Sequence, residues 1–274
     1  MAENSKISWC DHTANYWWGC MKVSPGCQHC YAETLSKRYG KSIWGPVATT
    51  DREYKKAVWQ DVPKWNKQAA ADGVRRRVFV QSMADFFEDH PQVVQWRNDA
   101  LALMADCTNL DFQVLTKRPE NIMSMIPTNW RPHKWGKIPD HIWIGTSVEN
   151  QEQADLRIPH LLKVPAAVKF LSCEPLLGQV DLEFFDIEYP YCRSDDEPGQ
   201  PAANPSRAGQ LISWVIAGAE SGHGVRPMSL DWVRDLRDQC QAAAVPFFFK
   251  QQIVDGQKVE LPALDGQVWA QFPA

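Results

Sequence analysis

Three of the eight cysteines fall within eleven residues, in the stretch Trp17–Glu33. Cys20, Cys27 and Cys30 have the spacing C-x6-C-x2-C, and Pro25-Gly26 predicts a turn just before the second cysteine. A helix is expected to begin at the third. One loop of this kind can direct three sulfurs at one centre, so we interpret the rest of the chain as a scaffold built around it.

Two kinds of metal centre fit this spacing. Three thiolates without a fourth cysteine in the same loop suit a four-iron cluster that keeps one iron free of protein ligands, and such an iron can bind a small molecule. Zinc is the alternative, with His29, His12 or Cys10 as a fourth ligand beside the three cysteines. Disulfides or inert core thiols are a further interpretation, and the local spacing leaves all of them open.

The composition is typical of an ordinary globular chain, with 44% hydrophobic and 23% charged residues. Its 274 residues can form one α/β barrel or two domains of usual size. The sequence contains neither an apolar run of about 18 residues nor the apolar core of a signal peptide, so we expect no membrane contact and a reducing, cytoplasmic location. The net charge of -4 gives no general attraction to nucleic acid.

From residue 75 onward, short apolar runs alternate with amphipathic helical patterns. The expected strands are 77–82, 111–116, 141–146, 167–172, 211–217 and 245–249, and the expected helices are 28–40, 92–105, one opening at 119, 151–162 and 230–243. With a first strand at 15–19 there are about seven strands. This alternation predicts an α/β fold, a partial or full parallel (β/α) barrel.

We predict one barrel domain over residues 1–250, with the cysteine loop at 17–31, and a C-terminal extension at 251–274. Residues 41–74 are expected to form an irregular crossing segment with a short helix around 51–59. Residues 184–210 contain little that could pack, which predicts a flexible insertion. Turns at Asp255-Gly256 and Asp265-Gly266 predict short hairpins in a C-terminal cap.

Polar residues follow the expected strands at the point where each one ends. They are Ser82, Asp85, Thr116, Lys117, Ser147, Glu149, Ser172, Glu174, Glu220 and Lys250. In parallel α/β folds the carboxyl edge of the sheet binds the ligand, and the cysteine loop follows the first strand to the same edge. The sequence therefore predicts a ligand site between the cysteines and these side chains.

Several short motifs occur in a fixed order along the chain. They are Trp18-Gly19-Cys20, Ser24-Pro25-Gly26-Cys27, Cys30-Tyr31-Ala32, Ser82-Met83-Ala84-Asp85, Leu115-Thr116-Lys117, Ser172-Cys173-Glu174-Pro175-Leu176-Leu177-Gly178, Glu220-Ser221-Gly222, Arg226-Pro227 and Phe249-Lys250-Gln251. Together they resemble the radical S-adenosylmethionine (SAM) superfamily and, more narrowly, a phage and bacterial family of three-Cys-motif proteins. The first cysteine gap is longer here than in the usual C-x3-C-x2-C motif.

The resemblance implies a [4Fe-4S] cluster on Cys20, Cys27 and Cys30, with SAM chelating the fourth iron. An external electron donor then reduces the cluster, SAM is cleaved, and a 5′-deoxyadenosyl radical takes a hydrogen atom from the substrate. In such an enzyme the protein supplies position, electrostatics and exclusion of water.

Cofactor-binding roles are assigned by strand position. Ser82 and Asp85 are candidates for the SAM ammonium group, Ser147 and Glu149 for the ribose hydroxyls, Lys117 for a carboxylate, and Ser172 completes the set. Asp85 and Ser147 could instead cap helices, and Lys117 could be a surface lysine.

Cys173, Glu174, Glu220 and Lys250 are the candidate catalytic residues. A structural alternative is a buried ion pair of either glutamate with Lys250 or Arg226. Cys173 could quench a radical through its thiol, but we favour the alternative that it is a small buried core residue.

The phage setting of the family implies a nucleic-acid substrate, such as an amino-acid-decorated thymidine in DNA on which an isomerase or lyase acts. Trp17, Trp18, Arg118 and Arg226 could stack a flipped base and contact phosphates, as could the run Arg75–Arg77, which could also be a solvated run before a strand. One alternative is radical chemistry on a peptide or small metabolite. The other is a zinc-stabilised protein that binds a partner without catalysis.

Overall fold

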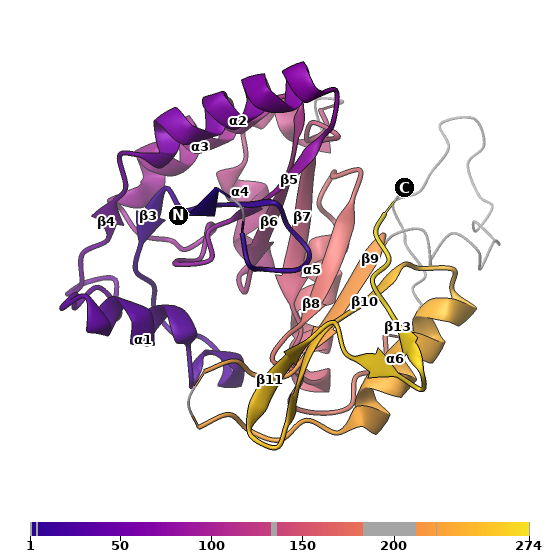
Figure 1. Ribbon diagram of the computed structural model, residues 1–274. Helices are drawn as coiled ribbons and strands as arrows, with labels where there is room; N and C mark the ends of the chain where they lie inside the picture. The colour runs from indigo at the N-terminus through magenta and orange to yellow at the C-terminus, as the bar shows by residue number, and fades with distance from the viewer. Residues whose placement is uncertain (1, 4, 133–135, 183–211, 223, 274) are drawn as a thin grey trace, which may run out of the picture.

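The computed structural model describes residues 2–3, 5–132, 136–182, 212–222 and 224–273 (Figure 1). Its centre is a nine-stranded sheet in the order β1-β2-β5-β6-β7-β8-β9-β10-β11. The strands are β1 (Ala2–Glu3), β2 (His12–Ala14), β5 (Arg76–Val80), β6 (Leu110–Thr116), β7 (Ile142–Ser147), β8 (Lys169–Cys173), β9 (Trp214–Gly218), β10 (Phe247–Val254) and β11 (Gln257–Glu260).

The sheet is mostly parallel and curls strongly into a half-barrel (Figure 1). The strands from β2 to β10 pair in parallel, while β1 and β11 run antiparallel to their neighbours at the two edges. The expected α/β fold with a parallel, partly closed sheet is therefore confirmed, and among the described residues the sheet remains open at β1 and β11.

In the described part of the chain, six α-helices accompany the sheet. They are α1 (Tyr31–Arg38), α2 (Val58–Asp72), α3 (Val93–Asp106), α4 (Ile122–Met125), α5 (Gln151–Leu162) and α6 (Leu230–Ala242). Alternate residues of each strand serve opposite faces of the sheet. In β5, Val78 and Val80 pack into the main core together with buried residues of the helices, whereas Phe79 faces the hollow of the half-barrel.

A second, aromatic cluster fills the inside of the half-barrel. Trp9, in the loop before β2, lies 4.5 Å from the Phe79 ring and 6.1 Å from the Trp214 ring. Phe170 and Phe248 belong to the same cluster. The loop that carries Trp9 lies across the open side of the sheet in Figure 1, so the chain itself fills this part of the interior.

The expected first strand at 15–19 is wrong. The first parallel strand is β2, and the chain leaves the sheet after Ala14 because the backbone N–H of Tyr16 donates to the Gln81 side chain at 2.7 Å. Trp17 and Trp18 form β3 (Trp17–Trp18), which pairs with β4 (Glu53–Tyr54) in a separate two-stranded sheet.

The expectation for residues 41–74 is wrong in its second half. Residues 58–72 form α2, whose residues Val58, Val62, Trp65 and Ala69 are buried at helical spacing. The scattered prolines and tryptophans of this stretch hide that pattern in the sequence.

The predicted turns near the C-terminus are confirmed. Asp255-Gly256 joins β10 to β11, and Asp265-Gly266 joins β12 (Ala263–Leu264) to β13 (Gln267–Val268). Strand β10 continues through the expected domain boundary at residue 250. The expected insertion at 184–210 lies outside the described residues. No described helix combines the length and the apolar character that crossing a membrane requires.

Candidate functional site

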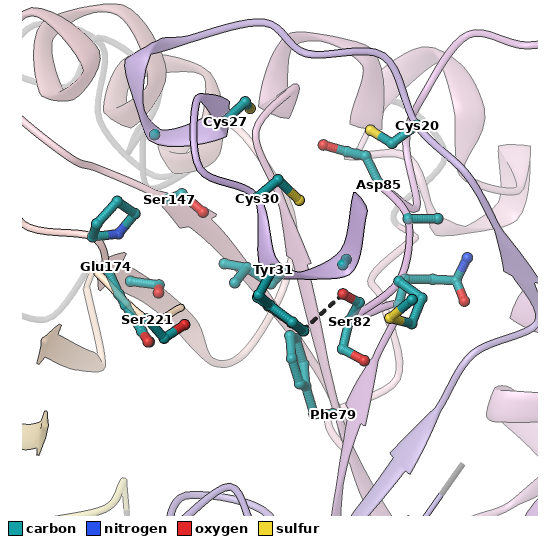
Figure 2. A pocket seen from close by; sticks show the side chains of 18 of the residues that line it. Cys20, Cys27, Cys30, Tyr31, Phe79, Ser82, Asp85, Ser147, Glu174 and Ser221 are labelled. Carbon is teal, nitrogen blue, oxygen red and sulfur yellow. Dashed lines mark hydrogen bonds between the residues drawn. The ribbon is translucent and has the colours of Figure 1, made fainter. Parts of the chain in front are cut away.

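A pocket of about 590 Å³ lies at the carboxyl ends of the parallel strands. Its wall includes most of the residues expected there from the sequence: Trp18, Cys20, Cys27, Cys30, Ser82, Asp85, Lys117, Ser147, Ser172, Glu174, Glu220 and Lys250. Figure 2 shows the three cysteines gathered on one side of this pocket, with Tyr31 and Ser82 next to them. The rule that polar strand ends meet at one edge therefore located the pocket.

The cysteine loop is shaped by its own sequence. Pro25–Cys27 form a single 3-10 turn, and Cys30 is the residue that caps α1. Both features were predicted from Pro25-Gly26 and from the helical pattern that follows. The turn and the helix start place Cys27 and Cys30 on the same stretch of pocket wall.

Glu149 holds the middle of this loop from the end of β7. Its carboxylate accepts hydrogen bonds from the Ser24 hydroxyl and from the backbone N–H of Gly26, the latter at 3.0 Å. Its other oxygen pairs with Arg157 at 2.7 Å, and neither side chain is more than 3% exposed. Burial alone would raise the pKa of Glu149, but Lys117, Arg157 and the loop donors outweigh it and lower that pKa.

A buried ionic network lies behind the first cysteine. Glu88 accepts two hydrogen bonds from Arg52, at 2.8 and 3.0 Å, and Arg118 pairs with Asp85 at 3.0 Å. The network also holds the residue after Cys20, because the Met21 N–H donates to Glu88 at 2.8 Å and the Met21 carbonyl accepts from Arg118 at 2.6 Å.

Arg118 also donates toward the Cys20 sulfur at 3.8 Å. The network therefore fixes the backbone that carries the first cysteine and faces its sulfur with a cation. A wide six-residue gap between the first two cysteines needs such support, because Cys20 lies outside the turn that positions the other two.

Glu220, at the end of β9, holds the far side of the loop. It pairs with Arg226 at 3.0 Å and with His29 Nδ1 at 3.0 Å, while Arg226 donates to the Pro25 carbonyl at 3.0 Å. Burial acts to raise the pKa of Glu220, but the hydrogen bonds from Arg226 and His29 lower it to about 2.

Two lysines enter the pocket from strand ends. Lys250 pairs with Glu174, which was one of the structural alternatives for this glutamate. Lys117 donates to the Ser147 hydroxyl at 2.9 Å and forms no ion pair within the described part of the chain. Lys117 therefore brings a positive charge to the pocket without a carboxylate in direct contact, although it lies close enough to Glu149 to help lower the pKa of that acid.

Some expected binding roles do not match the contacts. Asp85, a candidate for an ammonium group, already accepts from the Thr116 hydroxyl at 2.6 Å, from the Lys117 N–H at 2.8 Å and from the Phe87 N–H at 3.0 Å, besides pairing with Arg118. Its oxygens are therefore fully used within the protein.

Five expected site residues are absent from the pocket wall: Trp17, Arg118, Glu149, Cys173 and Arg226. Trp17 is completely buried against Phe86, so it belongs to the core and cannot stack a base. Arg118 is buried in its ion pairs rather than free to contact phosphates. Burial raises the pKa of the Cys173 thiol to about 12, as expected of a core thiol.

Several residues that shape the site were not expected from the sequence. Tyr31 donates its hydroxyl to the Ser82 carbonyl at 2.8 Å and forms pocket wall beside Cys30. Arg52 and Glu88 supply the network behind Cys20. In the sequence, the only indication of this network is the acidic pair Glu88-Asp89, which follows the strand that ends at Val80. No spacing rule links this pair to Arg52.

The three loop cysteines are free thiols. Among the described residues, no group of three or more His, Cys, Asp or Glu side chains is arranged to hold a metal ion. All ligands of a zinc ion converge on one atom, whereas the thiolates of a four-iron cluster bind separate irons and stand farther apart. Three thiols spread over one side of a large pocket fit the second arrangement better than the first.

Two of the three loop thiols, those of Cys20 and Cys30, have raised pKa values. Burial raises the pKa of Cys20 to about 12, with Asp85 and Glu88 adding to the effect, and burial also raises the pKa of Cys30. A metal centre would therefore have to displace the protons of these two thiols when it binds.

Fold and site together define a curled α/β half-barrel with a cysteine-lined pocket at the strand ends. The chain belongs to the family described as protein of unknown function (DUF5131), which matches residues 4–273. No curated protein and no solved structure matches it.

Proposed function

We propose that this protein is an iron–sulfur enzyme of the radical SAM type. The observation that carries the proposal is the placement of Cys20, Cys27 and Cys30 on one side of a large pocket at the carboxyl edge of a parallel half-barrel. When bound, a [4Fe-4S] cluster with SAM supplies one-electron cleavage of the sulfonium and an organic radical. The protein's own residues supply position and charge.

The loop residues are held by partners from four parts of the scaffold. Glu149 binds the turn before Cys27, Glu88 and Arg118 bind the Met21 peptide, and Glu220 binds His29. These contacts support a metal centre on the loop, because partners outside the ligand set orient the ligands themselves.

Lys117 supports an anionic ligand group. Its ammonium group reaches the pocket from the end of β6 and is held at 2.9 Å from Ser147. A ligand carboxylate placed there would gain a charge-assisted hydrogen bond. The amino-acid end of SAM has such a carboxylate.

The substrate class of the proposal is a nucleic-acid base. Of the four residues first expected to bind it, Trp17 and Arg118 are buried and do not support this class, whereas Trp18 lies in the pocket wall. Further support comes from a basic and aromatic surface on α1 and the β3–β4 pair, beside the pocket.

The test is anaerobic purification and reconstitution, followed by iron and sulfide analysis and by electron paramagnetic resonance of the reduced protein with and without SAM. We expect about four irons per chain and a spectrum that SAM perturbs. Replacing Cys20, Cys27 and Cys30 by alanine should abolish iron binding. The matched control is the Cys107→Ala, Cys240→Ala variant, whose thiols are buried away from the pocket and which should retain its iron.

One zinc per chain with no response to SAM would overturn the proposal. The protein would then be a zinc-stabilised binding protein. Iron that persists in the triple alanine variant would also overturn it, because the cluster would have to lie elsewhere.

A further inference from the structure

A strip of basic and aromatic side chains covers α1 and the β3–β4 pair, which lie beside each other at one end of the molecule (Figure 1). We define this basic strip as Lys22, Lys37, Arg38, Tyr39, Lys41, Tyr54, Lys55 and Lys56. Residues 22–56 contain seven basic and three acidic side chains, although the whole chain has a net charge of -4. The strip is therefore locally positive on an acidic protein.

The carboxylates within the strip do not neutralise it. Glu33 is shared by Lys22 and Lys37, each at 2.7 Å. Glu53 is likewise shared by Lys55 at 2.8 Å and Lys41 at 3.2 Å. Because one negative charge faces two ammonium groups in each trio, one positive charge per trio remains.

Two further cations of the strip add to this excess. Arg38 and Lys56 are exposed and have no ion-pair partner in the described part of the chain. Their positive charges are therefore available to an anionic partner.

Aromatic rings lie between these charges. The Tyr39 side chain is 62% exposed and packs beside Trp18, with ring centres 6.0 Å apart. The Lys55 ammonium lies over the same Trp18 ring at 3.7 Å. Tyr54, which is 44% exposed, stacks on the Trp59 ring at 5.7 Å. Exposed rings interleaved with cations are the surface that single-stranded nucleic acids use, stacking bases on rings and placing phosphates on cations.

The strip leads into the pocket. Lys22 belongs both to the strip and to the pocket wall. Trp18, which packs against Tyr39 and Lys55 of the strip, and Leu35 of α1 line the same wall. A strand held on this surface would therefore pass the pocket mouth beside the cysteine loop.

The run Arg75–Arg77 does not offer an equivalent surface. Arg75 pairs with Asp111, Arg76 with Asp72 at 2.8 Å and Arg77 with Asp11 at 3.5 Å. Each of these arginines has its own carboxylate, so the run is electrically balanced.

We propose that the basic strip binds single-stranded nucleic acid and holds it across the pocket mouth. The idea that the bound strand presents a base to the pocket rests on the proposed function. The idea that the strand binds to the strip does not. An acidic polypeptide would be drawn to the same charges, yet it would leave the exposed tyrosine rings without stacking partners.

The test measures binding of fluorescently labelled single-stranded DNA and RNA oligonucleotides by anisotropy, with metal-free protein and a series of salt concentrations. The test variant is Arg38→Glu, Lys56→Glu. The control is Lys67→Glu, Lys163→Glu, which makes the same charge change at exposed positions outside the strip. We expect the test variant to bind at least about tenfold more weakly, with a shallower dependence on salt, and the control to lose much less.

Tyr39→Ala tests the stacking component. We expect it to lower affinity by about tenfold without changing the dependence on salt, because it removes a ring and no charge.

Three results would overturn the inference: no binding by the wild-type chain at low salt, equal losses in the test and control variants, or competition by polyglutamate as effective as that by unlabelled oligonucleotide. The triple alanine variant of Cys20, Cys27 and Cys30 should bind oligonucleotide like the wild type. Loss of iron and loss of nucleic-acid binding are therefore separate outcomes, and each refutes a different claim.

Discussion

The buried network behind Cys20 makes Glu88→Gln the most informative single substitution. The Glu88 side chain is 1% exposed and the Arg52 side chain that faces it is 0% exposed. Glutamine keeps the shape of the side chain but removes its charge. The buried Arg52 guanidinium then keeps its positive charge without the negative charge that faced it. The paired hydrogen bonds from Arg52 to the two carboxylate oxygens are disrupted as well.

The expected magnitude follows from what the carboxylate holds. Glu88 accepts two guanidinium hydrogen bonds from Arg52 and one backbone hydrogen bond from Met21, and lies 3.5 Å from Arg118. Breaking a buried ion pair on one side costs about 3–5 kcal/mol. A typical domain has a free energy of unfolding of about 5–15 kcal/mol, so the loss would be a large share of the total.

Urea denaturation followed by tryptophan fluorescence measures the change. The matched control is Lys137→Ala, which breaks the ion pair between Lys137 and Asp140. Both of these side chains are more than 60% exposed, so the substitution should lower the free energy of unfolding by less than about 1 kcal/mol. The double variant Arg52→Met, Glu88→Leu should recover much of the loss, because no unpaired charge of the Arg52–Glu88 pair remains buried. A Glu88→Gln variant within about 1 kcal/mol of the control would refute the reasoning.

Three further substitutions probe other parts of the site. Gly145→Ala in β7 would place a methyl group 2.5 Å from the Phe170 ring and should cost about 1–3 kcal/mol in urea denaturation. Glu220→Gln should flatten the acid limb of the stability–pH curve. The folded pKa of Glu220 is about 2 and its ordinary value is 4.5, so its stabilisation is complete above pH 4.5, falls towards pH 2 and amounts to about 3 kcal/mol at most. Lys117→Met should cost at most about 1 kcal/mol in the free energy of unfolding, because it removes the longer-range attraction to Glu149 but no direct ion pair among the described residues, yet weaken SAM binding in equilibrium dialysis.

The strands and the pocket could be predicted because they depend on local pattern and on one topological rule. Continuous apolar runs between turn signals identified β5 to β10, and α5 occupies the expected residues 151–162. Parallel strands then bring their polar ends to one edge, whatever the loop lengths between them. That rule alone predicts that Ser82, Lys117 and Glu174 lie near one another, and all three line the pocket.

The network behind Cys20 could not be predicted in this way. Arg52 and Glu88 are 36 residues apart, and neither lies in a regular strand or helix. Their pairing depends on how the segment after β3 folds back over the end of β5, which no periodicity encodes. The same holds for Trp17, whose burial follows from the small β3–β4 sheet rather than from its place beside the cysteine loop.

The structure also changes the roles of the charged residues at the strand ends. Each of the four expected acids already has a basic partner: Asp85 has Arg118, Glu149 has Arg157, Glu174 has Lys250 and Glu220 has Arg226. Three of these pairs fix the cysteine loop or the segments next to it, so the acids serve the scaffold. Lys117, by contrast, forms no direct ion pair among the described residues, and its ammonium group contacts the Ser147 hydroxyl instead. A pocket with this balance is complementary to a ligand that brings a negative group to the end of β6, and its cysteines lie within reach of the same ligand.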